Sequence, residues 1–183
     1  MGGMLRRLRK MEARSIMGGL PERLQAVAGR IASAARAAGR GPGDIRLVAV
    51  SKTFPPERIR AAFDAGQRDF GENYVQEAVD KIDALGALPI TWHYIGPIQS
   101  NKTRTIAERF HWVHSVDRLK IAERLSAQRP SGLPLLEICL QVNVSGEESK
   151  SGVAAFARAH GDSRADRRCR LAAQPFRDFA TTA

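Results

Sequence analysis

The sequence predicts an α/β fold, specifically a partial (β/α)8 TIM-type barrel of about five βα units followed by an irregular C-terminal tail. Helical and strand patterns alternate from residue 20 to about residue 150, which is typical of parallel α/β folds. Polar residues follow almost every predicted strand, as expected where a barrel builds its site from several strand ends. A doubly wound sheet is the alternative, but it would concentrate its ligand groups at one switch point.

The individual elements are read from hydrophobic spacing and from helix-ending residues. A helix is expected over residues 21–38, and a β-branched apolar strand follows at 45–50. Pro56 suits the first turn of the next helix, which ends at Gly66. We expect Asp117 to cap the helix that follows it and Gly71 to provide a sharp turn at a strand end. The remaining expected strands are 68–71, 91–95, 112–115 and 135–144, and the remaining helices are 74–85, 102–110 and 119–128.

The composition of the sequence changes after Gly152, and this change sets the last of the predicted domain boundaries. Residues 1–19 form a basic N-terminal extension, residues 20–152 an incomplete barrel, and residues 153–183 a divergent, poorly ordered tail. The tail is rich in Arg and Ala, and no strand-like run is expected in it. Our hypothesis is that the sequence is truncated or frame-shifted after about Gly152.

Composition points to an ordinary globular protein of 183 residues, with 43% hydrophobic residues and no apolar run long enough to span a bilayer. Of the net charge of +10, residues 1–19 carry +4 and residues 153–183 carry +3, which leaves +3 for the predicted barrel. A basic balance can indicate nucleic-acid binding, but this excess lies at the ends, so we expect no nucleic-acid partner and no membrane partner. The two cysteines form no metal-ligand pattern, and a reducing cytoplasm is expected.

Lys52 is the most specific candidate residue, because it lies two positions beyond the end of an apolar strand. A lysine nucleophile must be neutral, and a partly dry pocket would favour that form. The alternative is a solvated loop lysine. Asn73 could reach a ligand or merely cap the next helix, and His93 could face a site or be a packed core residue. Residues 141–152 are interpreted first as a solvated loop.

Five segments occur in order: AVSKT (49–53), FGENYVQE (70–77), WHYIGPIQSNK (92–102), HSVD (114–117) and QVNVSGEESKSG (141–152). Together they closely resemble the pyridoxal phosphate homeostasis proteins, whose fold is similar to the N-terminal barrel of alanine racemase. The resemblance covers roughly residues 20–152. It implies that Lys52 holds pyridoxal 5'-phosphate as a Schiff base and that Asn73 lines the pocket. His93 and Ser145 become further candidates for cofactor contact.

The resemblance implies a non-catalytic, monomeric carrier that takes part in intracellular cofactor homeostasis and delivers the cofactor to apo-enzymes. A single predicted domain agrees with a carrier role. Amino-acid chemistry on this cofactor needs a second acid or base on the other face of the cofactor, which alanine racemase supplies from another domain. The sequence departs from the family after Gly152, where the late loops that grip the phosphate would follow. The alternatives are a racemase-like enzyme acting on amino acids, a basic nucleic-acid-binding module, and a non-functional fragment.

Overall fold

Five short parallel strands form one sheet in the order β1-β2-β3-β4-β5. The computed structural model describes residues 19–147 and 149–154. The strands of the sheet are β1 (Ala49–Val50), β2 (Asp69–Glu72), β3 (Thr91–Tyr94), β4 (Trp112–Val116) and β5 (Glu137–Leu140). The other elements are α2 (Leu20–Ala37), the short 3-10 helix η1 (Pro42–Asp44), α3 (Pro56–Asp64), α4 (Val75–Ala84), α5 (Thr103–Arg109), α6 (Leu119–Gln128), β6 (Val142–Asn143) and β7 (Val153–Ala154).

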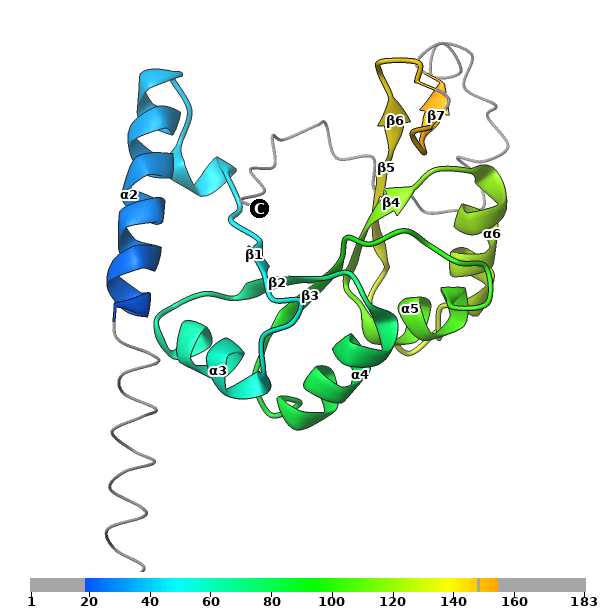
Figure 1. The fold of residues 1–183 in the computed structure, drawn as a ribbon, viewed down its shortest axis with the longest axis horizontal. Coiled ribbons are helices and arrows are strands. Elements are labelled where there is room, and N and C mark those ends of the chain that lie inside the picture. Colours follow the sequence, from blue (N-terminus) through cyan, green and yellow to red (C-terminus); the bar gives the residue numbers. More distant parts are fainter. Residues whose placement is uncertain (1–18, 148, 155–183) are drawn as a thin grey trace, which may run out of the picture.

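Each strand of the sheet pairs with the next strand along the chain, and every pairing is parallel. The helices α3 to α6 connect the strands and follow one another along the same face of the curved sheet (Figure 1). A doubly wound sheet would reverse its strand order at a switch point and place helices on both faces. The observed order therefore confirms the prediction of a partial (β/α) barrel.

The hydrophobic core lies between the sheet and its helices. Side chains alternate across a strand, and the helix-facing positions of β2, β3 and β4 carry large apolar groups. Phe70, Trp92 and Val113 are at most 4% exposed, and the Phe70 and Trp92 rings lie 6.1 Å apart. Ile106 of α5 and Leu125 of α6 are fully buried against them. This one-sided burial leaves the opposite face of the sheet free to carry polar groups.

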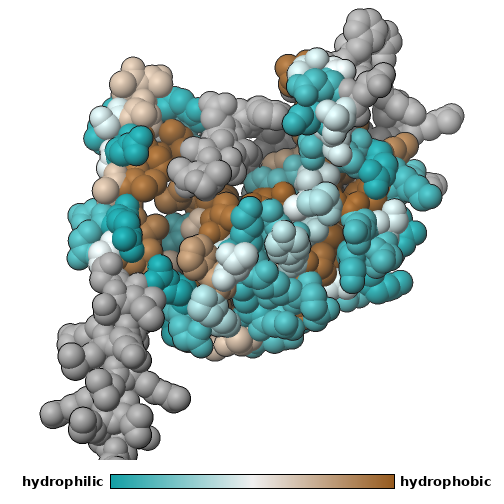
Figure 2. All heavy atoms as spheres, in the orientation of Figure 1, coloured by the Kyte–Doolittle hydropathy of each residue, from teal (hydrophilic) through white to brown (hydrophobic). Residues whose placement is uncertain are grey.

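The helix α2 stands at the β1 end of the sheet, where it contacts α3 and η1 (Figure 1). Leu20 and Leu24 line an apolar hollow together with Val50 of β1, Ile59 of α3 and Phe54 from the turn between them. Brown, hydrophobic spheres gather in this region in Figure 2, whereas hydrophilic residues cover much of the outer helices. Among the described residues, no helix is long and apolar enough to cross a membrane.

Two predicted strands are shorter in the structure. The run 45–50 pairs continuously with β2 only at Ala49 and Val50. At Leu47 the backbone carbonyl accepts instead from the Gln67 side-chain amide at 2.8 Å. The run 135–144 is divided into β5 and β6 at Gln141. Its N–H donates to Val116 O at 2.9 Å, whereas its carbonyl accepts from Val153 N–H at 2.8 Å. Gln141 is therefore the residue at which the chain leaves the five-stranded sheet and enters a second, two-stranded sheet.

The prediction that no strand follows Gly152 was wrong. Val153 and Ala154 form β7, which pairs in parallel with β6. Gly152 makes this possible, because its φ of +135° is open to glycine and a Cβ there would approach Asn143 N to 2.5 Å. Backbone pairing thus creates a strand where the side chains give no strand-like run. The remainder of the predicted tail, residues 155–183, and the predicted extension up to residue 18 lie outside the described residues.

Two local predictions were also wrong. Asp117 does not cap α6: the N-cap position is Arg118, and no side chain caps it. The Asp117 carboxylate instead accepts hydrogen bonds from the Arg118 guanidinium at 2.8 and 2.9 Å. Gly71 is not a turn residue but a buried member of β2. A Cβ at Gly71 would lie 3.0 Å from Ile95 Cδ1 and 3.2 Å from Val48 Cγ1, so glycine serves close packing on this face.

Candidate functional site

The polar residues that follow β1 and β2 lie at the same edge of the sheet. Val50 is level with Gly71 in the parallel register, and Ser51 N–H donates to Gly71 O at 2.9 Å. Lys52 and Asn73 are the next polar residues along their chains. This is the carboxyl-terminal edge of the strands, where (β/α) barrels assemble their sites. Two of the predicted strand-end residues, Lys52 and Asn73, therefore lie at one edge of the sheet, and their contact with a common ligand stays a prediction.

Lys52 occupies a turn between β1 and α3, and its side chain is exposed. The described residues therefore do not provide the partly dry surroundings that the sequence led us to expect. The next residue, Thr53, has a left-handed φ of +66°, which non-glycine residues adopt only with strain. Its N–H donates to Glu77 Oε1 at 2.5 Å. The turn is thus held in an uncommon conformation by a side chain from α4.

A buried charge cluster lies directly beneath this turn. Lys81 of α4 is 4% exposed, and its Nζ donates to Glu72 Oε1 at 2.8 Å, Glu77 Oε1 at 2.6 Å and Ser51 O at 2.7 Å. Ser51 Oγ donates to Glu72 Oε1 at 2.6 Å. We call Ser51, Glu72, Glu77 and Lys81 the turn-anchoring cluster. It links the end of β1, the end of β2 and the first turns of α4.

The two carboxyl groups of the cluster have pKa values that move in opposite directions. Burial raises the pKa of Glu72, and the hydrogen bonds from Lys81 and Ser51 only partly oppose this. The hydrogen bond from Lys81 lowers the pKa of Glu77, which is more exposed. Glu72 Oε2 is buried without a hydrogen-bond partner among the described residues. Glu77 is therefore the more firmly ionised partner of the Lys81 ammonium.

Asn73 follows β2 in a bend and is half-buried. Its Oδ1 is buried and has no hydrogen-bond partner among the described residues, so an acceptor oxygen remains available there. The predicted role of Asn73 as a helix cap is not observed, because the N-cap of α4 is Tyr74. Gly96 lies against its backbone: a Cβ at Gly96 would come within 2.9 Å of Asn73 Cα and closer still to its carbonyl oxygen.

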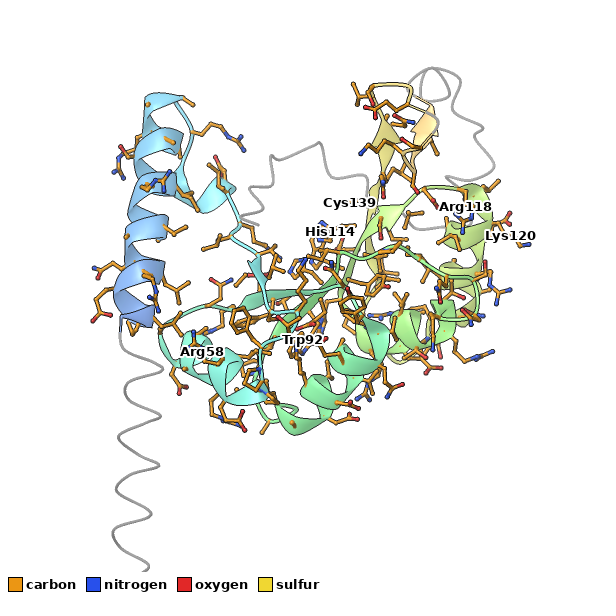
Figure 3. All side chains as sticks on the ribbon, in the orientation of Figure 1. Arg58, Trp92, His114, Arg118, Lys120 and Cys139 are labelled. Atoms are coloured by element: carbon orange, nitrogen blue, oxygen red, sulfur yellow. The ribbon has the colours of Figure 1, made fainter. Side chains whose placement is uncertain are left out.

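His93 lies in the middle of β3 on the sheet face opposite the helices, and it is fully buried. Its Nε2 is 3.0 Å from Asp69 Oδ1 and its Nδ1 is 2.9 Å from His114 Nε2. The Trp112 ring stacks on it at 5.7 Å, and the Arg46 guanidinium lies over Trp112 and 3.3 Å from Asp69 Oδ1. Figure 3 shows His114 on β4 beside β5. Both ring nitrogens of His93 are engaged, so a cofactor contact would have to use the ring carbons.

These histidines are held neutral. Burial lowers the pKa of His93, although the hydrogen bond to Asp69 opposes the shift. Burial, with a smaller effect from His93, lowers the pKa of His114 to about 4. Burial also lowers the pKa of His111, whose Nδ1 accepts from Trp92 N–H at 3.0 Å. The interpretation of His93 as a packed, hydrogen-bonded residue fits this geometry, and its cofactor contact stays a prediction.

Ser145 lies away from the five-stranded sheet along the chain, in the exposed loop between β6 and β7. Its Oγ donates to Asn143 Oδ1 at 3.3 Å, and the same oxygen accepts from Gly146 N–H at 3.0 Å. These bonds form a local turn of the loop. The structure brings Lys52 and Asn73 to one edge but gives no contact from Ser145 to either, so its cofactor role also stays a prediction.

Sequence reasoning noted Glu72 only as a polar residue at a strand end, gave Glu77 no role of its own and did not single out Lys81. Glu77 and Lys81 are four residues apart on α4, a spacing that normally indicates an exposed ion pair on a helix surface. The signal that could have found them is the apolar face of α4, since Lys81 falls three residues after the buried Ala78. No group of three or more potential metal ligands lies together in the part of the chain that the structure describes.

Comparison with curated proteins finds close relatives. The chain is 64% identical over 138 residues to the pyridoxal phosphate homeostasis protein of Pseudomonas aeruginosa, a match covering 75% of this chain and 60% of that protein. It is 53% identical over 140 residues to the Escherichia coli protein of the same name, with the same coverage of 75% and 60%. No family model matches the chain. The chain spans about three fifths of the length of these relatives.

Solved structures share the fold. PipY of Synechococcus elongatus with pyridoxal phosphate bound matches with a TM-score of 0.59 and 41% identity, over 76% of this chain and 61% of PipY. A protein of unknown function from Bifidobacterium adolescentis matches with a TM-score of 0.68 and 36% identity, over 81% of this chain and 62% of that one. These matches confirm the resemblance stated from the motifs and the partial-barrel fold.

Proposed function

We propose that this chain, a relative of the pyridoxal phosphate homeostasis proteins over its matched residues, binds pyridoxal 5'-phosphate through a Schiff base with Lys52. In this proposal it takes part in intracellular homeostasis of that cofactor. The observation that carries the proposal is the placement of Lys52 in an anchored turn at the carboxyl-terminal edge of the sheet. A homologous structure that binds the cofactor supports it.

The residues at this edge fit the cofactor. Asn73 Oδ1 is a buried acceptor without a partner among the described residues, and a ligand hydroxyl or N–H would satisfy it. Gly96 lets the Asn73 backbone pack closely against it, because a Cβ there would overlap the Asn73 carbonyl oxygen. When bound, pyridoxal phosphate supplies an aldehyde and an electron-withdrawing ring. Lys52 and Asn73 are the described residues that would hold it.

Lys52 acts as the nucleophile in this binding. Its neutral ε-amine forms a C–N bond to the aldehyde carbon, and the carbonyl oxygen leaves as water. Because the Lys52 side chain is exposed, the water formed in this step can leave and the water needed for release can enter. Reversible capture and release follow from this exposure.

An exposed lysine beside acids that are already engaged elsewhere, as the described residues place Lys52, suits a carrier better than an enzyme. The titratable groups of the turn-anchoring cluster are engaged with one another, and His93 and His114 are hydrogen-bonded to each other on the opposite face of the sheet. Amino-acid chemistry on this cofactor needs a separate, well-placed acid or base. In our proposal the protein is therefore a carrier of the cofactor. We also propose that it is monomeric and cytoplasmic and delivers the cofactor to apo-enzymes.

Titration with pyridoxal phosphate tests the proposal. We expect a visible Schiff-base absorbance band, and borohydride reduction should fix the cofactor's mass on the peptide that contains Lys52. Lys52→Ala should abolish both signals. Lys120→Ala is the matched control, because Lys120 is an exposed lysine on α6 that points away from the sheet (Figure 3). Labelling that survives Lys52→Ala would contradict the assignment. Turnover of amino acids by the loaded protein would contradict the carrier role.

A further inference from the structure

The turn that carries Lys52 is fixed on both sides of the lysine. On the N-terminal side, Ser51 N–H donates to Gly71 O at 2.9 Å, and Ser51 O accepts from Lys81 Nζ at 2.7 Å and from Phe54 N–H at 3.1 Å. On the C-terminal side, Thr53 N–H donates to Glu77 Oε1 at 2.5 Å. The backbone at Lys52 is thus clamped while its side chain stays exposed.

The conformation that the clamp holds is a strained one. Thr53 has a φ of +66°. This left-handed backbone conformation is unfavourable for a β-branched residue, because its side chain crowds the backbone. The Glu77 carboxylate compensates, because a charged acceptor makes a stronger hydrogen bond to a backbone N–H than a neutral one. Without Glu77 the turn would relax toward a commoner conformation, and the direction of the Lys52 side chain would change with it.

Lys81 cannot replace Lys52 as the reactive lysine. Its three ammonium protons are used by Ser51 O, Glu72 Oε1 and Glu77 Oε1, which is the full donor capacity of a lysine. The Lys81 side chain is 5% exposed and Glu72 is fully buried. Lys81 is therefore a structural cation that holds Glu77 in place and pins Ser51 O directly.

We propose that Glu77 and Lys81 are positioning residues for Lys52: they hold the strained Ser51–Thr53 turn so that the Lys52 amine is aimed at the incoming aldehyde. This inference rests on the proposed function and states what α4 contributes to it. Glu77 and Lys81 themselves touch neither cofactor nor reacting atoms in this assignment. They act through the backbone of the turn.

Paired variants of Glu77 separate positioning from charge. Glu77→Gln keeps an acceptor oxygen for Thr53 N–H and loses the charge, whereas Glu77→Leu has similar size and no acceptor. We expect Glu77→Leu to slow formation of the Lys52 adduct with pyridoxal phosphate by at least about tenfold, since misplacing a reacting group by about 1 Å can cost on the order of a hundredfold. Glu77→Gln should recover most of that loss. Asp80→Leu, which removes an exposed acid from the same helix, should have no effect.

A second variant tests the strain directly. Glycine adopts a left-handed backbone without strain, so Thr53→Gly added to Glu77→Leu should restore part of the adduct rate. A purely structural role for Glu77 would not respond to this change at a different residue. Thermal melting of each variant, followed by circular dichroism, shows that the rates compare folded proteins.

Amide hydrogen exchange at Thr53, measured without cofactor, provides a readout that does not depend on the proposed function. We expect faster exchange in Glu77→Leu than in the parent and in Glu77→Gln. Equal exchange in all three, or an unchanged adduct rate in Glu77→Leu with faster exchange, would overturn the positioning role. If the parent forms no adduct at all, the proposed function fails, and the exchange data alone still decide whether Glu77 holds the turn.

Discussion

Replacing His114 should change how stability depends on pH. His114 is held neutral in the folded protein, with a pKa lowered to about 4 by burial and by His93. In the unfolded chain its pKa returns to about 6.5. Between these values the unfolded state binds more protons than the folded state, so stability rises with pH. The contribution is fully present above pH 6.5 and is lost as pH falls toward 4.

The magnitude follows from the shift. A difference of about 2.5 pH units at about 1.4 kcal/mol per unit corresponds to about 3.5 kcal/mol at most, of which about 3 kcal/mol is lost by pH 4. That is a large share of a typical domain stability of about 5–15 kcal/mol. Glu72 works in the opposite direction, because its raised pKa lets the folded state bind a proton first as pH falls. A comparison of variant with parent cancels that effect, since Glu72 is present in both.

The assay is urea unfolding of the parent and of His114→Gln at a series of pH values from 7.5 down to 4, a range chosen to span both pKa values. Glutamine keeps an N–H that can donate to His93 Nδ1 but does not titrate. We expect the parent to lose stability more steeply than the variant as pH falls, with the two curves separating by up to about 3 kcal/mol. Parallel curves would refute the assignment of a buried neutral His114.

Three further changes test the site. Gly96→Ala should destabilise the protein and weaken cofactor capture, because the new Cβ would meet the Asn73 carbonyl, and unfolding curves together with adduct yields measure both effects. Asn73→Ala should weaken pyridoxal phosphate binding by about tenfold, the equivalent of one lost hydrogen bond, while Lys52 remains reactive; an unchanged dissociation constant would remove Asn73 from the site. The chain should bind pyridoxal phosphate more weakly than the full-length Pseudomonas aeruginosa relative, because it matches only 60% of that protein and barrels commonly hold phosphate in loops after strands seven and eight. Equal affinities would contradict this reasoning.

The sequence predicts elements well where the hydrophobic pattern is local. The helix expected over residues 119–128 is α6 to the residue, because its apolar spacing and the following Pro130 determine both ends. Prediction from the sequence fails where the limits of an element depend on its pairing partners. Residues 45–48 look like strand but lack a continuous neighbour, and Val153–Ala154 do not look like strand yet pair with β6. Strand limits depend on backbone bonds to distant residues, which a side-chain pattern does not contain.

The candidate site shows the same division. Lys52 and Asn73 were found because they follow apolar strands, and their shared edge is a consequence of parallel topology. The turn-anchoring cluster was not found, because Lys81 resembles an exposed helix lysine until the fold brings Ser51 O to within 2.7 Å of its Nζ.

Strand β2 connects the two polar clusters and also separates them. Asp69 begins the strand and Glu72 ends it, so their side chains project from opposite faces. Asp69 bonds His93 on the open face, whereas Glu72 bonds Lys81 and Ser51 on the helix face. Because the turn-anchoring cluster and the histidine cluster (Asp69, His93 and His114) share no residue and bond to opposite faces of β2, a change in the histidine cluster should alter stability without altering the Lys52 turn. The proposed cofactor site therefore depends on α4, whereas the loss of stability that we predict for His114 on acidification depends on β3 and β4.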